Sequence, residues 1–236
     1  MTSLKNWDNK TWLSSKKYIT AFNNFILKQK KLNKYSKILD IGCGRGKILE
    51  DLSKRLKLIS KPIGLDIENH KDKSKKILFK KNDGLTFISK TKTTFDLILI
   101  KQTIHLLKKN QISKLLKLCK EKLNKDGKIL ILSIDPDNNE IPTFKIMHKI
   151  LDKSLERDKK IFNLINNIYP QLLTKSYIYP VKILKEDYLK MIKKRYISTL
   201  LNLTNKQILD GIKEIDTNYK KELRFKDQLI CFIIKK

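Results

Sequence analysis

KILDIGCGRGKILEDL, residues 37–52, predicts an apolar strand, a turn with glycine at every second position, and a helix. Glycine is needed where a chain turns sharply from strand to helix and where a ligand lies against bare backbone. Asp40 stands two residues before the first glycine, and the spacing is G-x-G-x-G rather than the G-x-G-x-x-G that binds a dinucleotide. An acid pointing into this turn suits a cationic ligand better than a diphosphate.

Short apolar runs rich in β-branched residues alternate with helical patterns around this turn. The predicted strands are residues 37–41, 62–66, 77–80, 95–100 and 128–133, and the predicted helices between them are residues 46–58, 68–76, 84–90 and 110–123. Strands that are apolar throughout are buried on both faces, which requires a parallel sheet covered by helices. The expected fold is a doubly wound α/β fold with a mostly parallel, Rossmann-like sheet.

The segments outside this alternation have a different period. Residues 10–33 predict an amphipathic helix, and residues 145–168 and 186–218 predict further helices. Two strand-like runs, residues 176–183 and 228–234, are expected to add an antiparallel hairpin to the sheet edge and so bring it to seven strands. We therefore expect an N-terminal helical segment (residues 1–35), a central core (36–134) and a helical cap with the two final strands (135–236).

Composition limits the class of protein. The 236 residues carry a formal charge of +29, and only five of the 53 basic residues are arginine. Such a charge fits either a solvated lysine surface without a specific partner or attraction for polyanions and acidic substrates. The start of the chain has no apolar leader and the three cysteines lack metal-ligand spacing, so we expect a cytoplasmic protein with no metal and no membrane partner.

The ordered motifs resemble those of the class I S-adenosylmethionine-dependent methyltransferases over about residues 35–134. The family's first motif is matched by the acid and the three glycines of the turn. Its ribose-binding acid after strand two is matched by Asp66, and its acid near the adenine after strand three by Asp83. FDLILIKQTIHLL, from Phe95, is similar to its fourth strand and the segment beside the methionine end. The resemblance implies S-adenosyl-L-methionine as cofactor, bound by Asp40, Gly42, Gly44, Gly46, Asp66, Ile67, Asp83, Gly84 and Lys101.

Each of these acids also has a purely structural alternative. Asp40 can cap the turn and Asp66 the following helix, while Asp83 lies in N-D-G, an ordinary turn sequence. His105, after strand four, is a candidate catalytic base, because an imidazole can take a proton near neutral pH; packing is its alternative, and His148 is a weaker candidate of the same kind. Aromatic residues could fold over the donor, whose sulfonium is attracted to ring faces: Trp7, Trp12, Tyr18, Tyr177 and Tyr179.

The residues after strand four bear on the acceptor. The family's nucleobase amino-group enzymes resemble [DNS]-P-P-[YFW] there, whereas this chain has I-K-Q-T, and the nucleophilic cysteine of the cytosine C5 enzymes is absent from that strand end. Direct in-line transfer to oxygen, sulfur, carbon or an unconjugated amine of a small molecule is therefore expected.

The C-terminal part of the sequence also favours a small-molecule acceptor. Residues 191–215 resemble the tails of small-molecule members such as the trans-aconitate methyltransferases, in which Arg195 opens an R-x-x-S segment. Arg195 either binds an anionic acceptor or forms a structural salt bridge. Two other functions remain open. The basic surface favours an RNA methyltransferase, although nucleic acid is the less favoured partner, and a relative could bind the donor without transferring its methyl group.

Overall fold

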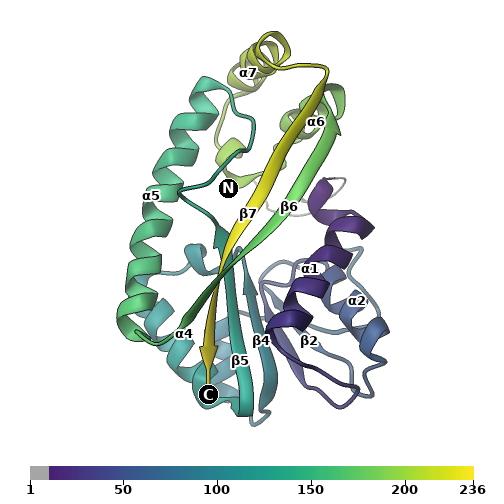
Figure 1. The fold of residues 1–236 in the computed structure, drawn as a ribbon, viewed down its shortest axis with the longest axis vertical. Coiled ribbons are helices and arrows are strands. Elements are labelled where there is room, and N and C mark those ends of the chain that lie inside the picture. Colours follow the sequence, from purple (N-terminus) through teal and green to yellow (C-terminus); the bar gives the residue numbers. More distant parts are fainter. Residues whose placement is uncertain (1–10) are drawn as a thin grey trace.

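A seven-stranded sheet runs through residues 11–236, the part of the chain that the computed structural model describes (Figure 1). Its order is β3-β2-β1-β4-β5-β7-β6. The strands are β1 (Ile38–Ile41), β2 (Ile63–Asp66), β3 (Leu78–Lys81), β4 (Phe95–Lys101), β5 (Leu123–Ile134), β6 (Leu173–Leu184) and β7 (Glu222–Lys235). The first five are parallel, and β7 is antiparallel to both β5 and β6. The expected fold, including the edge hairpin, is confirmed.

The strand order reverses between β1 and β4. From β1 the chain continues to β2 on one side, and it returns to β4 on the other. In open α/β sheets the crevice outside the carboxyl ends of the strands at this point is where ligands bind. The turn after β1 and the end of β4 therefore define where a functional site is expected.

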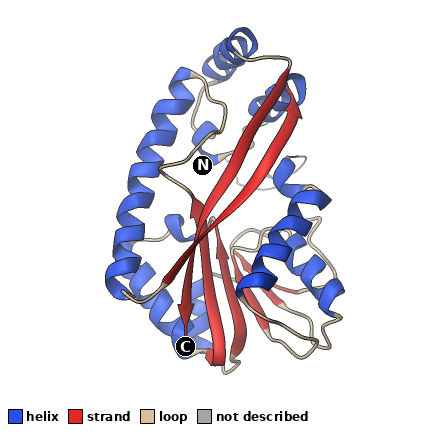
Figure 2. Cartoon of the chain, viewed as in Figure 1, coloured by secondary structure: helices blue, strands red, loops and turns tan. Residues whose placement is uncertain are grey.

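Helices cover both faces of the sheet (Figure 2). On one face, α1 (Lys16–Gln29) and α2 (Lys47–Leu56) pack through Tyr18, Phe22 and Leu49. On the other lie α3 (Gly84–Lys90), α4 (Lys109–Glu121) and α5 (Lys145–Ile168). Two short 3₁₀ helices flank these elements: η1 (Trp12–Ser14) precedes α1, and η2 (Ile104–Leu106) follows β4. This is the doubly wound arrangement that the alternating pattern predicts.

A third apolar cluster lies beyond the sheet, where β6 and β7 extend upward past the other strands in Figure 1. Here α6 (Lys185–Lys193), the 3₁₀ helix η3 (Ser198–Leu200) and α7 (Asn205–Asn218) surround Tyr188, Tyr196 and Phe225. The first turns of α5 join this cluster through Met147, whereas its last turns pack on the sheet through Ile165. Helix α5 thus belongs to both the sheet and the cap.

Four expectations about secondary structure need correction. Residues 68–76 form turns rather than a helix, because this run of lysine and short polar residues has no apolar face. The predicted helix of residues 186–218 is divided into α6 and α7. At the break, Arg195 has a φ of 52°. Strand β3 is largely exposed rather than buried, since it is an edge strand. The N-terminal helix begins only at α1, after Ser15, whose side chain accepts a hydrogen bond from Tyr18 N.

Residues 1–10, and with them Trp7, lie outside the described part of the chain. Within residues 11–236, no helix combines the length and apolarity that crossing a bilayer requires. The same residues contain no group of three or more histidine, cysteine or acidic side chains that could hold a metal ion.

Candidate functional site

The glycine turn (residues 42–46) lies at the carboxyl end of β1. Leu65 O on β2 accepts hydrogen bonds from the N–H groups of Gly42 and Cys43, both at 2.8 Å. Gly42 has a φ of 81°, and a Cβ there would lie 2.0 Å from Thr103 Oγ1. Gly44 has a φ of 54°, but a Cβ there would meet nothing within 4 Å. The first glycine is therefore required by packing, whereas the second borders open space in which a ligand could lie against the backbone.

Asp66, the last residue of β2, is hydrogen-bonded to this turn. Its Oδ2 accepts from Gly44 N at 2.8 Å and its Oδ1 from Glu68 N at 2.9 Å. His70 Nε2, from a buried imidazole, lies 3.8 Å from Oδ1. An ionised carboxylate has about four lone-pair sites, so Asp66 can still accept hydrogen bonds from ligand hydroxyls. Ile67 follows it with its apolar side chain 59% exposed.

The segment that was expected to be helical, residues 68–76, closes over the glycine turn. Asp72 Oδ2 lies 3.0 Å from Nη1 of the buried Arg45, and Ser74 N donates to Arg45 O at 2.9 Å. A Cβ on Gly46 would lie 2.2 Å from Ile77 Cδ1, at the end of the same segment. Sequence reasoning missed this clamp, because Arg45 and Asp72 are 27 residues apart and Asp72 belongs to no recognisable motif.

Asp40 lies within β1 on the face covered by α1 and is 2% exposed. Its Oδ1 is buried and has no hydrogen-bond partner among the described residues. Burial raises the pKa of Asp40 to about 7; the Lys101 ammonium opposes this rise and the Asp66 carboxylate adds to it. Beside it, burial raises the pKa of the Cys43 thiol, so this cysteine is neutral and a poor nucleophile at neutral pH.

Lys101 ends β4 next to β1. Its Nζ lies 5.5 Å from the centre of the Tyr18 ring and 5.4 Å from that of Phe22, both on α1. These are cation–π distances. Lys101 therefore holds α1 against the carboxyl end of the sheet.

Asp83 and Gly84 follow β3. Asp83 caps α3, with Oδ1 accepting from Thr86 N at 2.9 Å. Burial acts to raise its pKa, but hydrogen bonds, mainly from Thr86, hold the pKa below its ordinary value. A Cβ on Gly84 would lie 2.7 Å from Ile41 Cγ2, so this glycine is required by packing. The capping alternative for Asp83 is thus present in the structure; an adenine contact stays a prediction.

The two candidate histidines lie apart. His105 is in η2, directly after β4, where burial lowers its pKa; Asp158 on α5 opposes this effect and Arg157 adds to it. Its imidazole is thus neutral at neutral pH and able to accept a proton. His148 is exposed on α5, with Nε2 3.4 Å from Asp152, and lines a cavity of about 870 Å³ to which the glycine turn does not contribute. Of these two candidates, His105 lies at the carboxyl edge of the sheet and His148 does not.

Arg195 lies in the cap, between α6 and η3. Its Nη2 donates to Leu203 O at 2.7 Å and to Asn205 Oδ1 at 3.1 Å. Both acceptors are uncharged, and no ion pair of Arg195 occurs among the described residues. The side chain holds the turn between α6 and α7 together, and it does not line either of the cavities described here. A contact with an acceptor stays a prediction.

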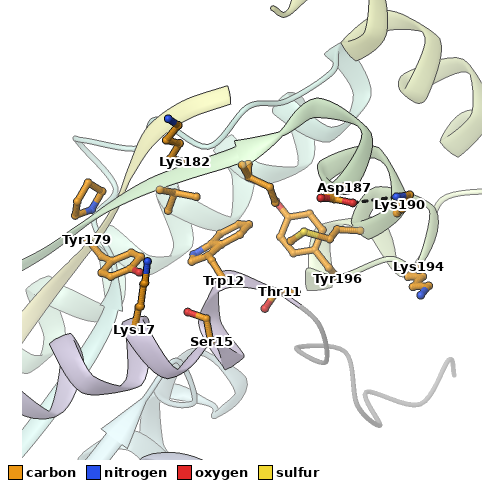
Figure 3. Close-up of a pocket in the computed structure, with 14 residues that line it drawn as sticks. Thr11, Trp12, Ser15, Lys17, Tyr179, Lys182, Asp187, Lys190, Lys194 and Tyr196 are labelled. Carbon is orange, nitrogen blue, oxygen red and sulfur yellow. Dashed lines mark hydrogen bonds and ion pairs between the residues drawn. The ribbon is translucent and has the colours of Figure 1, made fainter. Parts of the chain in front are cut away.

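A cavity of about 650 Å³ lies between the start of α1, strand β6 and helix α6 (Figure 3). Trp12, Tyr179 and Tyr196 form aromatic parts of its wall. Its charged residues are Lys17, Lys182, Asp187, Lys190 and Lys194. Its remaining lining residues are Thr11, Ser15, Pro180, Val181, Ile183 and Met191. It is thus an apolar and aromatic hollow with a mainly basic rim.

Trp12 and Tyr179 connect this cavity to the sheet. Trp12 Nε1 donates to Oδ2 of the buried Asp227 on β7 at 3.1 Å. Tyr179 packs edge-on against Tyr18 with 5.0 Å between ring centres, and Tyr18 is the residue whose ring lies under Lys101. Trp12, Tyr18 and Tyr179 thus lie between the cap and the end of β4, and none of them comes within 4 Å of the position of a Cβ on Gly44.

Comparison with known proteins decides the family. The family described as "Methyltransferase domain" matches residues 15–166, which is more than half of the chain and contains every strand up to β5. The chain belongs to this methyltransferase family. It is accordingly an S-adenosylmethionine-dependent class I methyltransferase, as its motifs implied, with S-adenosyl-L-methionine as its cofactor.

Solved structures share the methyltransferase's fold at low sequence identity. The plantazolicin methyltransferase BpumL in complex with SAH is 19% identical, with a TM-score of 0.54 over 98% of this chain and 87% of that chain. A putative methyltransferase from an antibiotic biosynthesis pathway of Anabaena variabilis is 15% identical, with a TM-score of 0.59 over 90% and 96%. A SAM-dependent methyltransferase from Archaeoglobus fulgidus is 20% identical, with a TM-score of 0.53 over 92% of both chains. None of the curated proteins matches the chain.

Proposed function

We propose that this methyltransferase binds its donor at the carboxyl ends of β1, β2 and β4 and methylates a small-molecule acceptor. The observation that carries the donor site is the open space over Gly44, next to a carboxylate that keeps free lone pairs. The residues fit S-adenosylmethionine. Asp66 would accept from the ribose hydroxyls, and exposed Ile67 would pack on the adenine. Asp40, whose buried Oδ1 has no hydrogen-bond partner among the described residues, would supply negative charge near the glycine turn for the donor's sulfonium.

The chemistry asks little of the protein beyond geometry. When bound, the donor supplies a methyl group already attached to a leaving group. The chain has to align the acceptor with it and exclude water. A carboxylate or thiolate acceptor needs no base, whereas a hydroxyl or amine does. His105 is the residue that we propose for that proton, since its imidazole is neutral and follows β4 directly. It does not line the 650 Å³ cavity, so the reacting atom of the acceptor would have to extend from that cavity to the end of β4.

We place the acceptor in the 650 Å³ cavity, whose volume suits a small molecule. Lys182 pairs with Glu222 at 3.1 Å and Lys190 with Asp187 at 2.9 Å, whereas Lys17 and Lys194 form no ion pair with a described residue. Two uncompensated ammonium groups beside aromatic rings favour an anionic acceptor with an apolar body. The names of two proteins of similar fold, a plantazolicin methyltransferase and an antibiotic-pathway methyltransferase, agree with a small molecule.

One observation, the charge of +29, favours RNA as the second candidate acceptor. A labelled-methyl assay against a metabolite extract and, in parallel, against total RNA tests the two. We expect incorporation into the extract. RNA binding should be weak and should fade near physiological salt, because a few non-specific phosphate contacts are screened there. Incorporation into one RNA species would contradict the small-molecule proposal.

Charge reversal tests the location of the acceptor. Lys17→Glu and Lys194→Glu should each raise the KM for an anionic acceptor about 10-fold or more, with donor affinity unchanged. Lys61→Glu is the matched control, since Lys61 is equally exposed but precedes β2 at the opposite end of the sheet. Equal acceptor KM values in all three variants would exclude this cavity as the acceptor site.

A further inference from the structure

We infer that Lys101 is a positioning residue for the donor, because its ammonium shares one face of the sheet with the buried acids Asp40 and Asp227 and sets the charge presented at the glycine turn. The inference rests on the proposed donor site. It assigns to the Lys101 side chain a role that acts through Asp40 rather than through contact with the donor.

The sheet register places the three groups on one face. Asp40 pairs with Leu99 of β4, and Lys101 lies two residues beyond Leu99, so both side chains point to the face covered by α1. Lys101 pairs with Leu132 of β5, which pairs with Cys231 of β7. Asp227 lies four residues before Cys231 and therefore on the same face.

The two acids are buried, and the half-buried Lys101 is partly shielded from water by aromatic rings. Asp40 and Asp227 are each 2% exposed, and Lys101 lies under the rings of Tyr18 and Phe22. The Lys101 ammonium lowers the pKa of both acids, against the burial that raises them. Without this cation, the two buried carboxyl groups that share one face of the sheet would take up protons instead of staying charged.

The groups facing Asp40 come from three elements. Lys101 on β4 stabilises its ionised form, while Asp66 on β2 and the neutral Cys43 thiol of the turn do not. Asp227 competes for the same ammonium, and it is in turn held by Trp12. The ionisation of Asp40 at the glycine turn is therefore linked, through Lys101, to Asp227 on β7 and to Trp12.

The test uses the one charge that distinguishes S-adenosylmethionine, a sulfonium, from S-adenosylhomocysteine, a neutral thioether. Calorimetric Kd values for both ligands are measured from pH 5.5 to 9.5. In the unaltered protein the preference for S-adenosylmethionine should rise with pH through about 7, as Asp40 ionises. In Lys101→Met the rise should move to higher pH, so that at pH 7.5 the preference is about 3- to 10-fold smaller and at pH 9.5 the two proteins converge.

Two further variants make the result decisive. Lys101→Arg keeps the charge and should restore the profile. Asp227→Asn removes the competing acid, so the rise should move to lower pH; this variant gives the answer even if the Met variant does not fold. Lys120→Met is the control, because its ammonium also lies over a ring, Tyr169 at 5.2 Å, but at the amino end of the sheet. It should leave the profile unchanged.

The experiment distinguishes failure of the proposed donor site from failure of the proposed role of Lys101. If the unaltered protein binds neither ligand, the proposed donor site is wrong. If it binds both, but folded Lys101→Met and Asp227→Asn keep the unaltered protein's preference at every pH, the donor site stands and the role of Lys101 is overturned.

Discussion

Asp66 Oδ2 accepts a hydrogen bond from the backbone N–H of Gly44 at 2.8 Å, so the acid that ends β2 is bonded to the turn that ends β1. The two strands are neighbours in the sheet, and this bond joins their carboxyl ends. A residue expected to bind the ribose thus also orders the backbone on which the donor is proposed to lie.

Asp66→Ala should therefore weaken S-adenosylmethionine binding by roughly 10- to 150-fold, since losing a charged acceptor costs about 1.5–3 kcal/mol. Calorimetry measures the loss, and circular dichroism checks that the sheet is intact. An Ala variant that is folded and binds with unchanged affinity would remove Asp66 from the donor site.

The glycines of the turn should respond differently to substitution. Gly44→Ala meets no atom within 4 Å and carries only the cost of a left-handed backbone, about 1 kcal/mol, whereas Gly42→Ala also collides with Thr103. We expect a small drop in Tm for the first variant and a large one for the second. Both should lose donor affinity, Gly44→Ala because its methyl group occupies the proposed ligand space. Normal binding by a stable Gly44→Ala variant would place the donor elsewhere.

Asp40 should make stability depend on pH. Its folded pKa of about 7 is above the ordinary value of 3.8, so its contribution to stability is present below about pH 4 and is lost as pH rises through 7. Asp40→Asn lacks this loss. Relative to the unaltered protein, its free energy of unfolding should increase between pH 5 and pH 8 by about 3 kcal/mol, because about two pH units below the folded pKa lie in this window. Urea titrations at the two pH values measure the difference, and parallel profiles would mean that Asp40 is not buried as described.

Variants of Arg195 distinguish a contact with the acceptor from a purely structural role. Its side chain donates hydrogen bonds to Leu203 O and Asn205 Oδ1, so Arg195→Ala should lower the Tm by loosening the turn after α6. If it also binds an anion, Arg195→Lys should raise the acceptor KM while donor affinity stays constant, because lysine lacks the two-pronged geometry. A thermal melt and steady-state kinetics read the two effects. A stable Ala variant with unchanged kinetics would exclude both roles.

The residues of the proposed donor site could be placed at the carboxyl ends of the strands from the sequence, because their positions are set locally. The glycine turn, Asp66 and Asp83 each stand at a fixed offset from the end of a strand, and the strand order of the fold then brings them together. The contact of Trp12 with Asp227 spans 215 residues and depends on how β7 pairs with β5, which no local pattern encodes.

The other misses have a related cause. Residues 68–76 were predicted to be helical from their place between two strands, but the contact of Asp72 with Arg45 holds them in turns over the glycine turn. The break between α6 and α7 lies at Arg195, a non-glycine residue with a positive φ, and propensity rules do not anticipate such a residue. Both features are set by tertiary contacts rather than by local sequence.

Strand β7 belongs to two cores, with Phe232 packed in the sheet and Phe225 packed in the cap. It is paired with β6 without interruption from the Leu173 and Ile233 pair to the Leu184 and Glu222 pair. A rigid-body opening of the cap would require breaking the hydrogen bonds between β6 and β7, so the cap is fixed to the sheet by these two strands. Entry and exit of reactants then depend on motion of η1 and the start of α1, which close the opposite side of the cavity; Trp12 of η1 contacts β7 through its hydrogen bond to Asp227 and its edge-on packing against Phe225.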